Sequence, residues 1–260
     1  MTLVLLCGFA FLAGLVDAVA GGGGLIQLPA LFLFLPSGAA SVPAFVFGTN
    51  KLSSICGTGV AVAQYSRRVA LPWKILCPAA GVAFASSILG ARLVSSLKPE
   101  LLKPLVIALL IFVAIFTYLN NSRPRCISKI TRKHELIYAI ITGAWLGFYD
   151  GFFGPGTGTF LIFIFVGLFG FDFLLASASA KVVNFATNLA AVIYFASKGL
   201  IYYEYALPMG VCNVAGSLLG SRLAILKGSN FVRRIFLVVV AALILKLVWD
   251  VVRAYWQVRL

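Results

Sequence analysis

The stretch LVDAVAGGGGLIQLP, from Leu15 to Pro29, places four consecutive glycines shortly after an aspartate inside an apolar run. The stretch GFYDGFFGPGTGTFLIF, from Gly147 to Phe163, follows the same plan in the second half of the chain. Each has an apolar run, an aspartate, a glycine-rich break and a second apolar run. Because glycine is a poor helix former, both stretches predict an apolar helix that is interrupted at the glycines.

The composition indicates a membrane protein. Of the 260 residues, 62% are hydrophobic and 11% are charged, whereas soluble domains average about 45–50% apolar and about 25% charged residues. Runs such as LVIALLIFVAIFTYL do not alternate apolar and polar residues, as the strands of a membrane β-barrel would. The sequence therefore predicts an all-α polytopic membrane protein.

Positive charge is concentrated in short loops beside the apolar segments. The net charge of +14 raises the question of nucleic-acid binding, but basic loops next to membrane spans are the usual determinant of topology. We therefore predict no nucleic-acid partner. The five cysteines show no C-x-x-C spacing, so the sequence predicts neither a metal site nor a cofactor.

The chain contains an internal duplication. The motif GLVD (14–17) matches GFYD (147–150) at an offset of 133, and ASSILGARL (85–93) matches AGSLLGSRL (215–223) at an offset of 130. We therefore expect a first transmembrane repeat over residues 1–120, a basic cytoplasmic linker over 121–133 and a second transmembrane repeat over 134–260. The apolar segments that form them are 3–20, 25–36, 42–65, 72–94, 101–119, 134–153, 158–171, 173–197, 203–224 and 231–252.

The glycine breaks decide how the repeats are oriented. From Leu3 to Pro36 a continuous helix would be about 51 Å long at about 1.5 Å per residue, longer than the hydrocarbon core of about 30 Å. A break lets the segment fold back as a hairpin, which together with three crossings gives an odd number of passes. We therefore expect inverted repeats, although the loop charges, about 12 against about 6 for inversion and about 11 against about 7 for parallel repeats, separate the two arrangements only slightly.

Four motifs carry a family resemblance: GLVDAVAGGGGLIQLPAL, TNKLSS, GFYDGFFGPGTGTF and AKVVNFATN. They resemble the TauE/SafE family of sulfite exporters, and in particular its YfcA-type inner-membrane proteins, over nearly the whole chain. The resemblance implies about eight membrane segments in two repeats. It also implies transport of sulfur-containing anions such as sulfite, organosulfonates or thiosulfate, and a location in the bacterial inner membrane.

The broken helices are the first candidate anion site. A helix N-terminus carries unsatisfied N–H groups and positive potential, and glycine lets an anion approach them closely. The alternative is that these small residues serve close helix packing. A nucleotide P-loop is excluded because neither stretch has the lysine of that motif. The predicted substrate-binding residues of the breaks are Gly21, Gly22, Gly23, Gly24, Gln27, Gly154, Gly156, Thr157, Gly158 and Thr159.

Lys51 and Lys181 occupy matching positions well inside apolar segments, where charged groups are costly and usually functional. They are interpreted either as direct ligands of an anion or as members of structural ion pairs. Asp17 and Asp150, one before each break, are their expected partners. The two aspartates either cap or pair, or they couple transport to protons, since protonation of a carboxylate would compensate an arriving anion.

Three asparagines lie near these lysines: Asn50, Asn184 and Asn188. They can either donate to substrate oxygens or hydrogen-bond between helices. The repeats differ here, because Ser54 matches Asn184 and Thr58 matches Asn188, so the site is expected to be asymmetric.

The sequence thus predicts a secondary transporter of small sulfur-containing anions that works by alternating access around a midplane site, and the family resemblance implies an exporter. The alternatives are a passive anion channel, a transporter of a non-sulfur small organic anion, a membrane-embedded enzyme and a structural subunit of an assembly. An enzyme is not expected, because no nucleophile–base or metal constellation is recognisable. The direction of transport, the coupling ion and the oligomeric state do not follow from the sequence.

Overall fold

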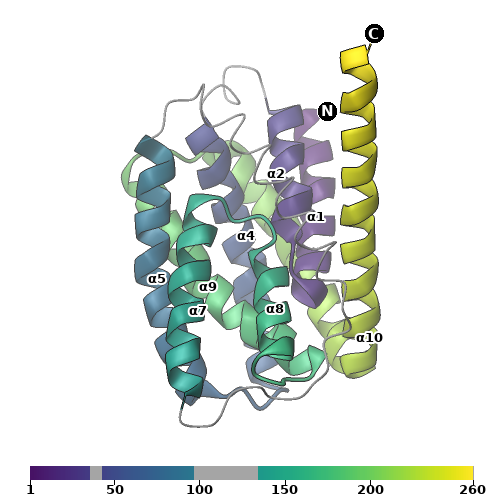
Figure 1. Cartoon of the computed structure of the whole chain (residues 1–260). Coiled ribbons are helices and arrows are strands. Elements are labelled where there is room, and N and C mark those ends of the chain that lie inside the picture. Colours follow the sequence, from purple (N-terminus) through teal and green to yellow (C-terminus); the bar gives the residue numbers. More distant parts are fainter. Residues whose placement is uncertain (36–42, 97–133, 260) are drawn as a thin grey trace.

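The computed structural model describes residues 1–35, 43–96 and 134–259, in which every regular element is an α-helix. The predicted apolar segment 101–119 and the linker 121–133 lie outside the described residues. The helices are α1 (Thr2–Ala20), α2 (Gly23–Phe34), α4 (Pro43–Ser66), α5 (Trp73–Ser96), α7 (Glu135–Phe152), α8 (Thr157–Gly167), α9 (Phe173–Ser197) and α10 (Tyr203–Arg259) (Figure 1).

Helix α10 consists of two helical parts that meet at Gly228. This glycine has φ 69° and ψ −168°, which is not a helical conformation. The break lies between the predicted apolar segments 203–224 and 231–252. As a result, the C-terminal end of α10 returns to the end of the molecule at which the N-terminus lies (Figure 1).

Four of the described helices are long and apolar enough to cross a membrane: Thr2–Ala20, Trp73–Ser96, Phe173–Ser197 and the part of α10 from Tyr203 to Ile235. Helices α2 and α8 are equally apolar but have only 12 and 11 residues. At about 1.5 Å per residue they reach about 18 Å, which is little more than half of a hydrocarbon core of about 30 Å. The protein is therefore a multi-pass membrane protein in which short helices accompany the long ones.

The long helices run in two opposite directions. Helix α10 packs parallel to α4, because Ser217 Oγ donates to the Gly57 carbonyl and Ser221 Oγ to Gln64 Oε1, with residue numbers rising together. A Cβ atom on Gly216 or Gly220 of α10 would collide with backbone atoms of Phe11 or Leu15 of α1, again with residue numbers rising together. Helices α1, α4 and the first part of α10 therefore run in the same direction. Helix α5 packs parallel to α9 through Ser87 and Thr187, and through Ser95 and Tyr194.

Helices α5, α7 and α9 run the opposite way. A Cβ atom on Gly143, Gly147 or Gly151 of α7 would collide with backbone atoms of Ala79, Ala83 or Ser87 of α5, again in rising order. Only residues 67–72 connect α4 to α5, too few to cross the bilayer at about 3.3–3.6 Å per residue. Helix α5 therefore starts where α4 ends and returns. Small residues at every fourth position let α5 and α7 approach closely, as in other membrane helix pairs.

Candidate functional site

Both predicted helix breaks are present. Helix α1 ends at Ala20 and α2 begins at Gly23, while α7 ends at Phe152 and α8 begins at Thr157. The residues directly before the short helices, Gly22 and Gly156, are left-handed, with φ 85° and 86°. Glycine adopts this conformation without the steric penalty that a Cβ atom imposes. The two breaks therefore share the conformation of the residue that precedes the short helix, while the first break spans residues 21–22 and the second residues 153–156.

The two breaks lie against each other, backbone to backbone. A Cβ atom on Gly158 would lie 2.9 Å from the Cα of Gly21 and also 2.9 Å from Asn184 Nδ2. A Cβ atom on Gly24 would lie 3.3 Å from the Cα of Pro155. The absence of side chains at these glycines thus brings the N-termini of α2 and α8 together. Close packing, one of the two roles considered for these glycines, is therefore observed.

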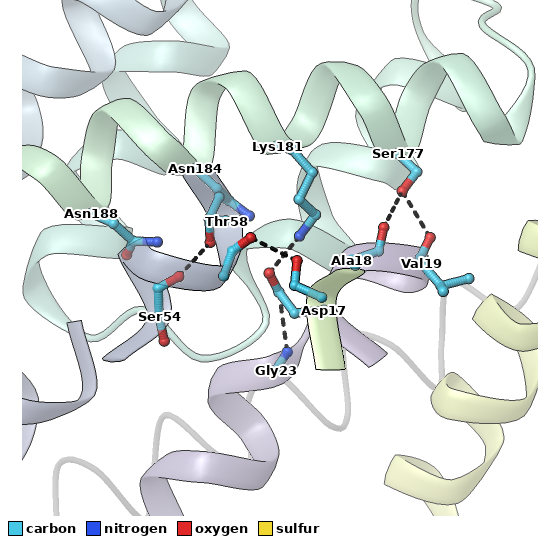
Figure 2. Close-up of polar contacts among 12 residues, drawn as sticks. Asp17, Ala18, Val19, Gly23, Ser54, Thr58, Ser177, Lys181, Asn184 and Asn188 are labelled. Atoms are coloured by element: carbon cyan, nitrogen blue, oxygen red, sulfur yellow. Dashed lines mark hydrogen bonds and ion pairs between the residues drawn. The ribbon is translucent and has the colours of Figure 1, made fainter. Parts of the chain in front are cut away.

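Each buried lysine is paired with the aspartate of the other half of the chain. Lys51 Nζ of α4 lies 2.6 Å from Asp150 Oδ2 of α7, and Lys181 Nζ of α9 lies 2.7 Å from Asp17 Oδ2 of α1 (Figure 2 shows the second pair). Both lysines are almost completely inaccessible. Since a buried charge requires a partner, the pairing explains how these lysines are tolerated inside the protein.

The two ion pairs have different further contacts. Lys51 Nζ also donates to Asn188 Oδ1 at 3.0 Å. On the other side, Asp17 uses its second oxygen, Oδ1, to accept from the backbone N–H of Gly23 at 3.3 Å (Figure 2). Asp17 therefore forms an ion pair with Lys181 and also accepts a hydrogen bond from the first residue of α2. Pairing and capping, two of the roles considered for Asp17, thus occur together.

A small polar cavity lies where the breaks and the ion pairs meet. Its volume is about 30 Å³, which is room for about two water molecules. Most of the predicted site residues line it, from both halves of the chain. The lining residues are Asp17, Gly22, Gly24, Asn50, Lys51, Ser54, Asp150, Gly154, Gly156, Thr157, Gly158, Asn184 and Asn188. We call this the central cavity.

Five of the predicted substrate-binding residues are not part of the central cavity lining: Gly21, Gly23, Gln27, Thr159 and Lys181. The Gln27 side chain instead connects elements of the protein, because its Oε1 accepts from Asn213 Nδ2 at 3.0 Å and its Nε2 donates to the Asn50 carbonyl at 3.5 Å. Thr159 Oγ1 is buried and has no hydrogen-bond partner in the described part of the chain. Lys181 is fully buried behind its pair with Asp17.

Side chains that the sequence analysis did not single out support the breaks. Tyr65 donates its hydroxyl to the Ala18 carbonyl at 2.7 Å, and Ser177 Oγ donates to the Val19 carbonyl at 2.8 Å. In the other half, Tyr149 donates to the Pro155 carbonyl at 2.8 Å. These bonds satisfy carbonyls left open where α1 ends and where the second break turns.

Ser54 lines the cavity, although the comparison of the two repeats identifies it only as the position that matches Asn184. Ser54 and Ser177 each lie one helical turn from a buried lysine, at Lys51 plus three and Lys181 minus four. Residues three or four positions apart lie on the same face of a helix, so each serine lies on the face that carries the lysine. This spacing is the feature of the sequence from which both serines could have been predicted to lie near the site.

The charges at the site balance, because two lysines and two aspartates form its ion pairs, although only Lys51 of the two lysines lines the cavity. The N-termini of α2 and α8 also lie at the cavity, and a helix N-terminus carries positive potential. Within the described residues, no group of three or more His, Cys, Asp or Glu side chains could hold a metal ion.

A helical membrane bundle with two broken helices around a buried polar cavity is an architecture typical of membrane transporters. Comparison with known proteins gives the same class. Residues 6–247 match the family described as "Sulfite exporter TauE/SafE". The chain belongs to the TauE/SafE family of membrane transporters.

Three relatives illustrate the match. The chain is 35% identical over 241 residues to "Probable membrane transporter protein ORF9" of Sinorhizobium sp., covering 93% of this chain and 90% of the relative. It is 33% identical over 246 residues to "Probable membrane transporter protein YfcA" of Escherichia coli, covering 93% and 87%. It is 32% identical over 251 residues to a "Probable membrane transporter protein" of Haemophilus influenzae, covering 95% and 94%. No solved structure matches the chain significantly.

Proposed function

We propose that this protein is a secondary transporter, with export as its direction, of small sulfur-containing anions such as sulfite, organosulfonate or thiosulfate. The family description supports a sulfur oxyanion, while the names of the relatives say only that they are membrane transporters. The observation that carries the proposal is the central cavity, where one buried lysine and two helix N-termini converge.

The proposed substrate contacts start from Lys51. Its ammonium group lines the cavity and is held by Asp150 Oδ2 and Asn188 Oδ1. An oxyanion entering the cavity competes with Asp150 for this ammonium group, and the Asn184 amide supplies a further donor from the wall. The Thr157 hydroxyl, by contrast, already donates to the Gly154 carbonyl at 2.7 Å. The volume of about 30 Å³ supports a small substrate and a conformation in which the site is nearly closed.

We further propose that the chain consists of inverted repeats, each with a broken hairpin and three transmembrane helices, over residues 1–120 and 134–260. The opposite directions of α4 and α9, and the opposite directions of α1 and α7, support this arrangement. Rocking of one repeat against the other then gives alternating access. Because each ion pair joins the two repeats, rocking exchanges the roles of Lys51 and Lys181 as the lysine that faces the substrate.

We propose that the movement of the anion is coupled to the movement of protons. A neutral set of two lysines and two aspartates gains a net negative charge when an anion binds. Protonation of Asp17 or Asp150, both of which line the cavity, compensates that charge. Each transport cycle would then move a proton with the anion.

We propose the bacterial inner membrane as the location, with the central linker 121–133 on the cytoplasmic side. The end of the molecule at which α4 ends and α7 begins carries an excess of exposed basic residues. These are Arg67, Arg68, Lys74, Arg222, Lys227, Arg233 and Arg234. An excess of positive charge marks the cytoplasmic side of membrane proteins.

The alternative of a passive channel is separated from a carrier by solute counterflow. Proteoliposomes loaded with sulfite, sulfoacetate, thiosulfate or sulfate should show saturable flux of at least one sulfur anion, and an internal excess of that anion should accelerate uptake of a labelled trace. Flux without saturation or counterflow would identify a channel. Transport of a small carboxylate in place of every sulfur anion would identify the non-sulfur alternative.

A further inference from the structure

A groove of about 640 Å³ lies on the outside of the bundle, between the last turns of α4 and the middle of α10. It lies at the end of the molecule where α4 ends and is separate from the central cavity, because the two share no lining residue. Its wall combines apolar side chains with three arginines. The apolar part consists of Val60, Ala63, Leu218, Ile225 and Leu226, and the arginines are Arg67, Arg68 and Arg222.

The floor of the groove is held in place by hydrogen bonds between its two helices. Ser221 Oγ donates to Gln64 Oε1 at 3.0 Å, and one turn deeper Ser217 Oγ donates to the Gly57 carbonyl at 2.6 Å. Gln64 itself lines the groove. In this conformation, helices α4 and α10 therefore form one continuous surface with a defined hollow.

The three arginines provide an unbalanced positive charge at the mouth of the groove. All three are exposed, and none of them forms an ion pair with any residue in the described part of the chain. An arginine guanidinium group binds phosphate oxygens in a bidentate manner and remains charged at every physiological pH. This end of the groove is therefore complementary to a phosphate group.

Apolar side chains of the wall lie beside the arginines on both helices. Leu226 is 82% exposed, and Ala63 is exposed as well. Leu226 belongs to the part of α10, from Tyr203 to Ile235, that is long and apolar enough to cross a membrane. A free oxyanion would satisfy the arginines but leave this wall unfilled, whereas a molecule with a phosphate head and an acyl chain satisfies both parts.

We propose that this groove binds an anionic phospholipid, with its phosphate on Arg67, Arg68 and Arg222 and an acyl chain along the apolar wall. Basic pockets between membrane helices on the cytoplasmic side recognise such headgroups. Since Arg67 and Arg68 belong to the first half of the chain and Arg222 to the second, the bound headgroup joins the two halves at this end. The lipid therefore stabilises one arrangement of the halves.

The test is thermal unfolding of the purified full-length chain in detergent with added phosphatidylglycerol, phosphatidylcholine or inorganic phosphate. We expect phosphatidylglycerol to raise the Tm by several degrees, because a ligand that binds only the folded state stabilises it. Phosphatidylcholine and inorganic phosphate should leave the Tm within a degree or so. An equal rise with inorganic phosphate would overturn the lipid proposal and indicate a phosphate site.

Two triple variants make the test specific. The variant Arg67→Gln, Arg68→Gln, Arg222→Gln should lose the Tm rise caused by phosphatidylglycerol. The control Lys74→Gln, Arg233→Gln, Arg234→Gln removes the same charge from exposed positions at the same end of the molecule and should keep the rise. An equal response of both triple variants would show that the groove does not bind the lipid.

A variant of the apolar wall keeps the proposal testable if the arginine variant does not fold. Ala63→Trp fills the groove from an exposed position of α4 and leaves all three arginines in place. We expect native mass spectrometry to find bound phosphatidylglycerol on the wild-type chain. We expect Ala63→Trp to abolish both this bound lipid and the Tm rise. Retention of both the Tm rise and the bound lipid would contradict the proposal. The same result would be expected if another segment of this chain occupied the groove.

Discussion

Lys51 on α4 and Asp150 near the end of α7 lie 2.6 Å apart, Nζ to Oδ2, although 99 positions separate them in the sequence. Lys181 and Asp17 form the corresponding pair over 164 positions. Each pair therefore joins the two halves of the chain beside the central cavity. A substrate that changes either pair also changes how the halves are held together, which links binding to conformational change.

Neutralising Lys51 alone should destabilise the protein. Lys51→Gln leaves the Asp150 carboxylate buried without its partner, and loss of one member of a buried pair costs about 3–5 kcal/mol. We expect the double variant Lys51→Gln, Asp150→Asn to recover most of the thermal stability while transport stays lost. If the double variant were as unstable as the single variant, the ion pair would not be the source of the effect.

The second pair tests the exchange of roles between the halves. The double variant Asp17→Asn, Lys181→Gln preserves neutrality, and the side-chain oxygen of the introduced asparagine can still accept from the backbone N–H of Gly23. We expect it to fold like the wild type but to lose at least about tenfold in flux, corresponding to about 1.4 kcal/mol. Wild-type flux from this variant would show that the pair is structural and that Lys181 never meets the anion.

Gly154 should be intolerant of a side chain. Its φ is 91°, and a Cβ atom would lie 3.1 Å from Lys51 Nζ. Gly154→Ala should lower stability by about 1–2 kcal/mol through the left-handed backbone and reduce flux through displacement of Lys51.

Gly81 of α5 provides the matched control for this substitution, because a Cβ atom there meets no atom within 4 Å. Gly81→Ala should stabilise the helix by about 0.5–1 kcal/mol and leave flux unchanged. Equal effects of both alanines on flux would argue against a specific role of the second break.

Proton coupling predicts that flux depends on pH across about pH 5–8. If a proton accompanies the anion, lowering the pH on the side from which the anion enters should accelerate transport. Asp150→Asn and Asp17→Asn should each weaken this dependence. Flux that is insensitive to pH, with both asparagine variants fully active, would exclude coupling through these carboxylates.

The sequence predicted those features of the site that have a local signature. Consecutive glycines in an apolar run interrupt a helix wherever it packs, so breaks could be predicted at residues 21–24 and 154–158. The structure has them at residues 21–22 and 153–156, because the last glycines of each stretch belong to the short helix that follows. A lysine within an apolar segment must be buried with a partner, so the four charged residues could also be identified. These inferences need no knowledge of how the helices are arranged.

The pairing and the cavity lining depend on tertiary packing. Nothing near Lys51 in the sequence indicates that its partner is Asp150 and not Asp17, because that choice is made by α7 packing beside α5 and α9. Likewise, Gln27 bonds to Asn213 of α10 instead of lining the cavity. Lys51 lines the cavity, whereas Lys181, at the matching position of the second half, is buried behind Asp17. The two halves therefore do not place matching residues identically, and the sequence alone does not reveal this difference.

The central claim is that an oxyanion binds at Lys51. The most direct test is initial sulfite flux into proteoliposomes that contain equal amounts of folded wild type, Lys51→Ala, Lys181→Ala or the exposed control Lys74→Gln. We predict saturable flux with the wild type and Lys74→Gln, and its loss in both buried-lysine variants. Undiminished flux in Lys51→Ala, or no flux of any sulfur anion through folded wild type, would contradict the account.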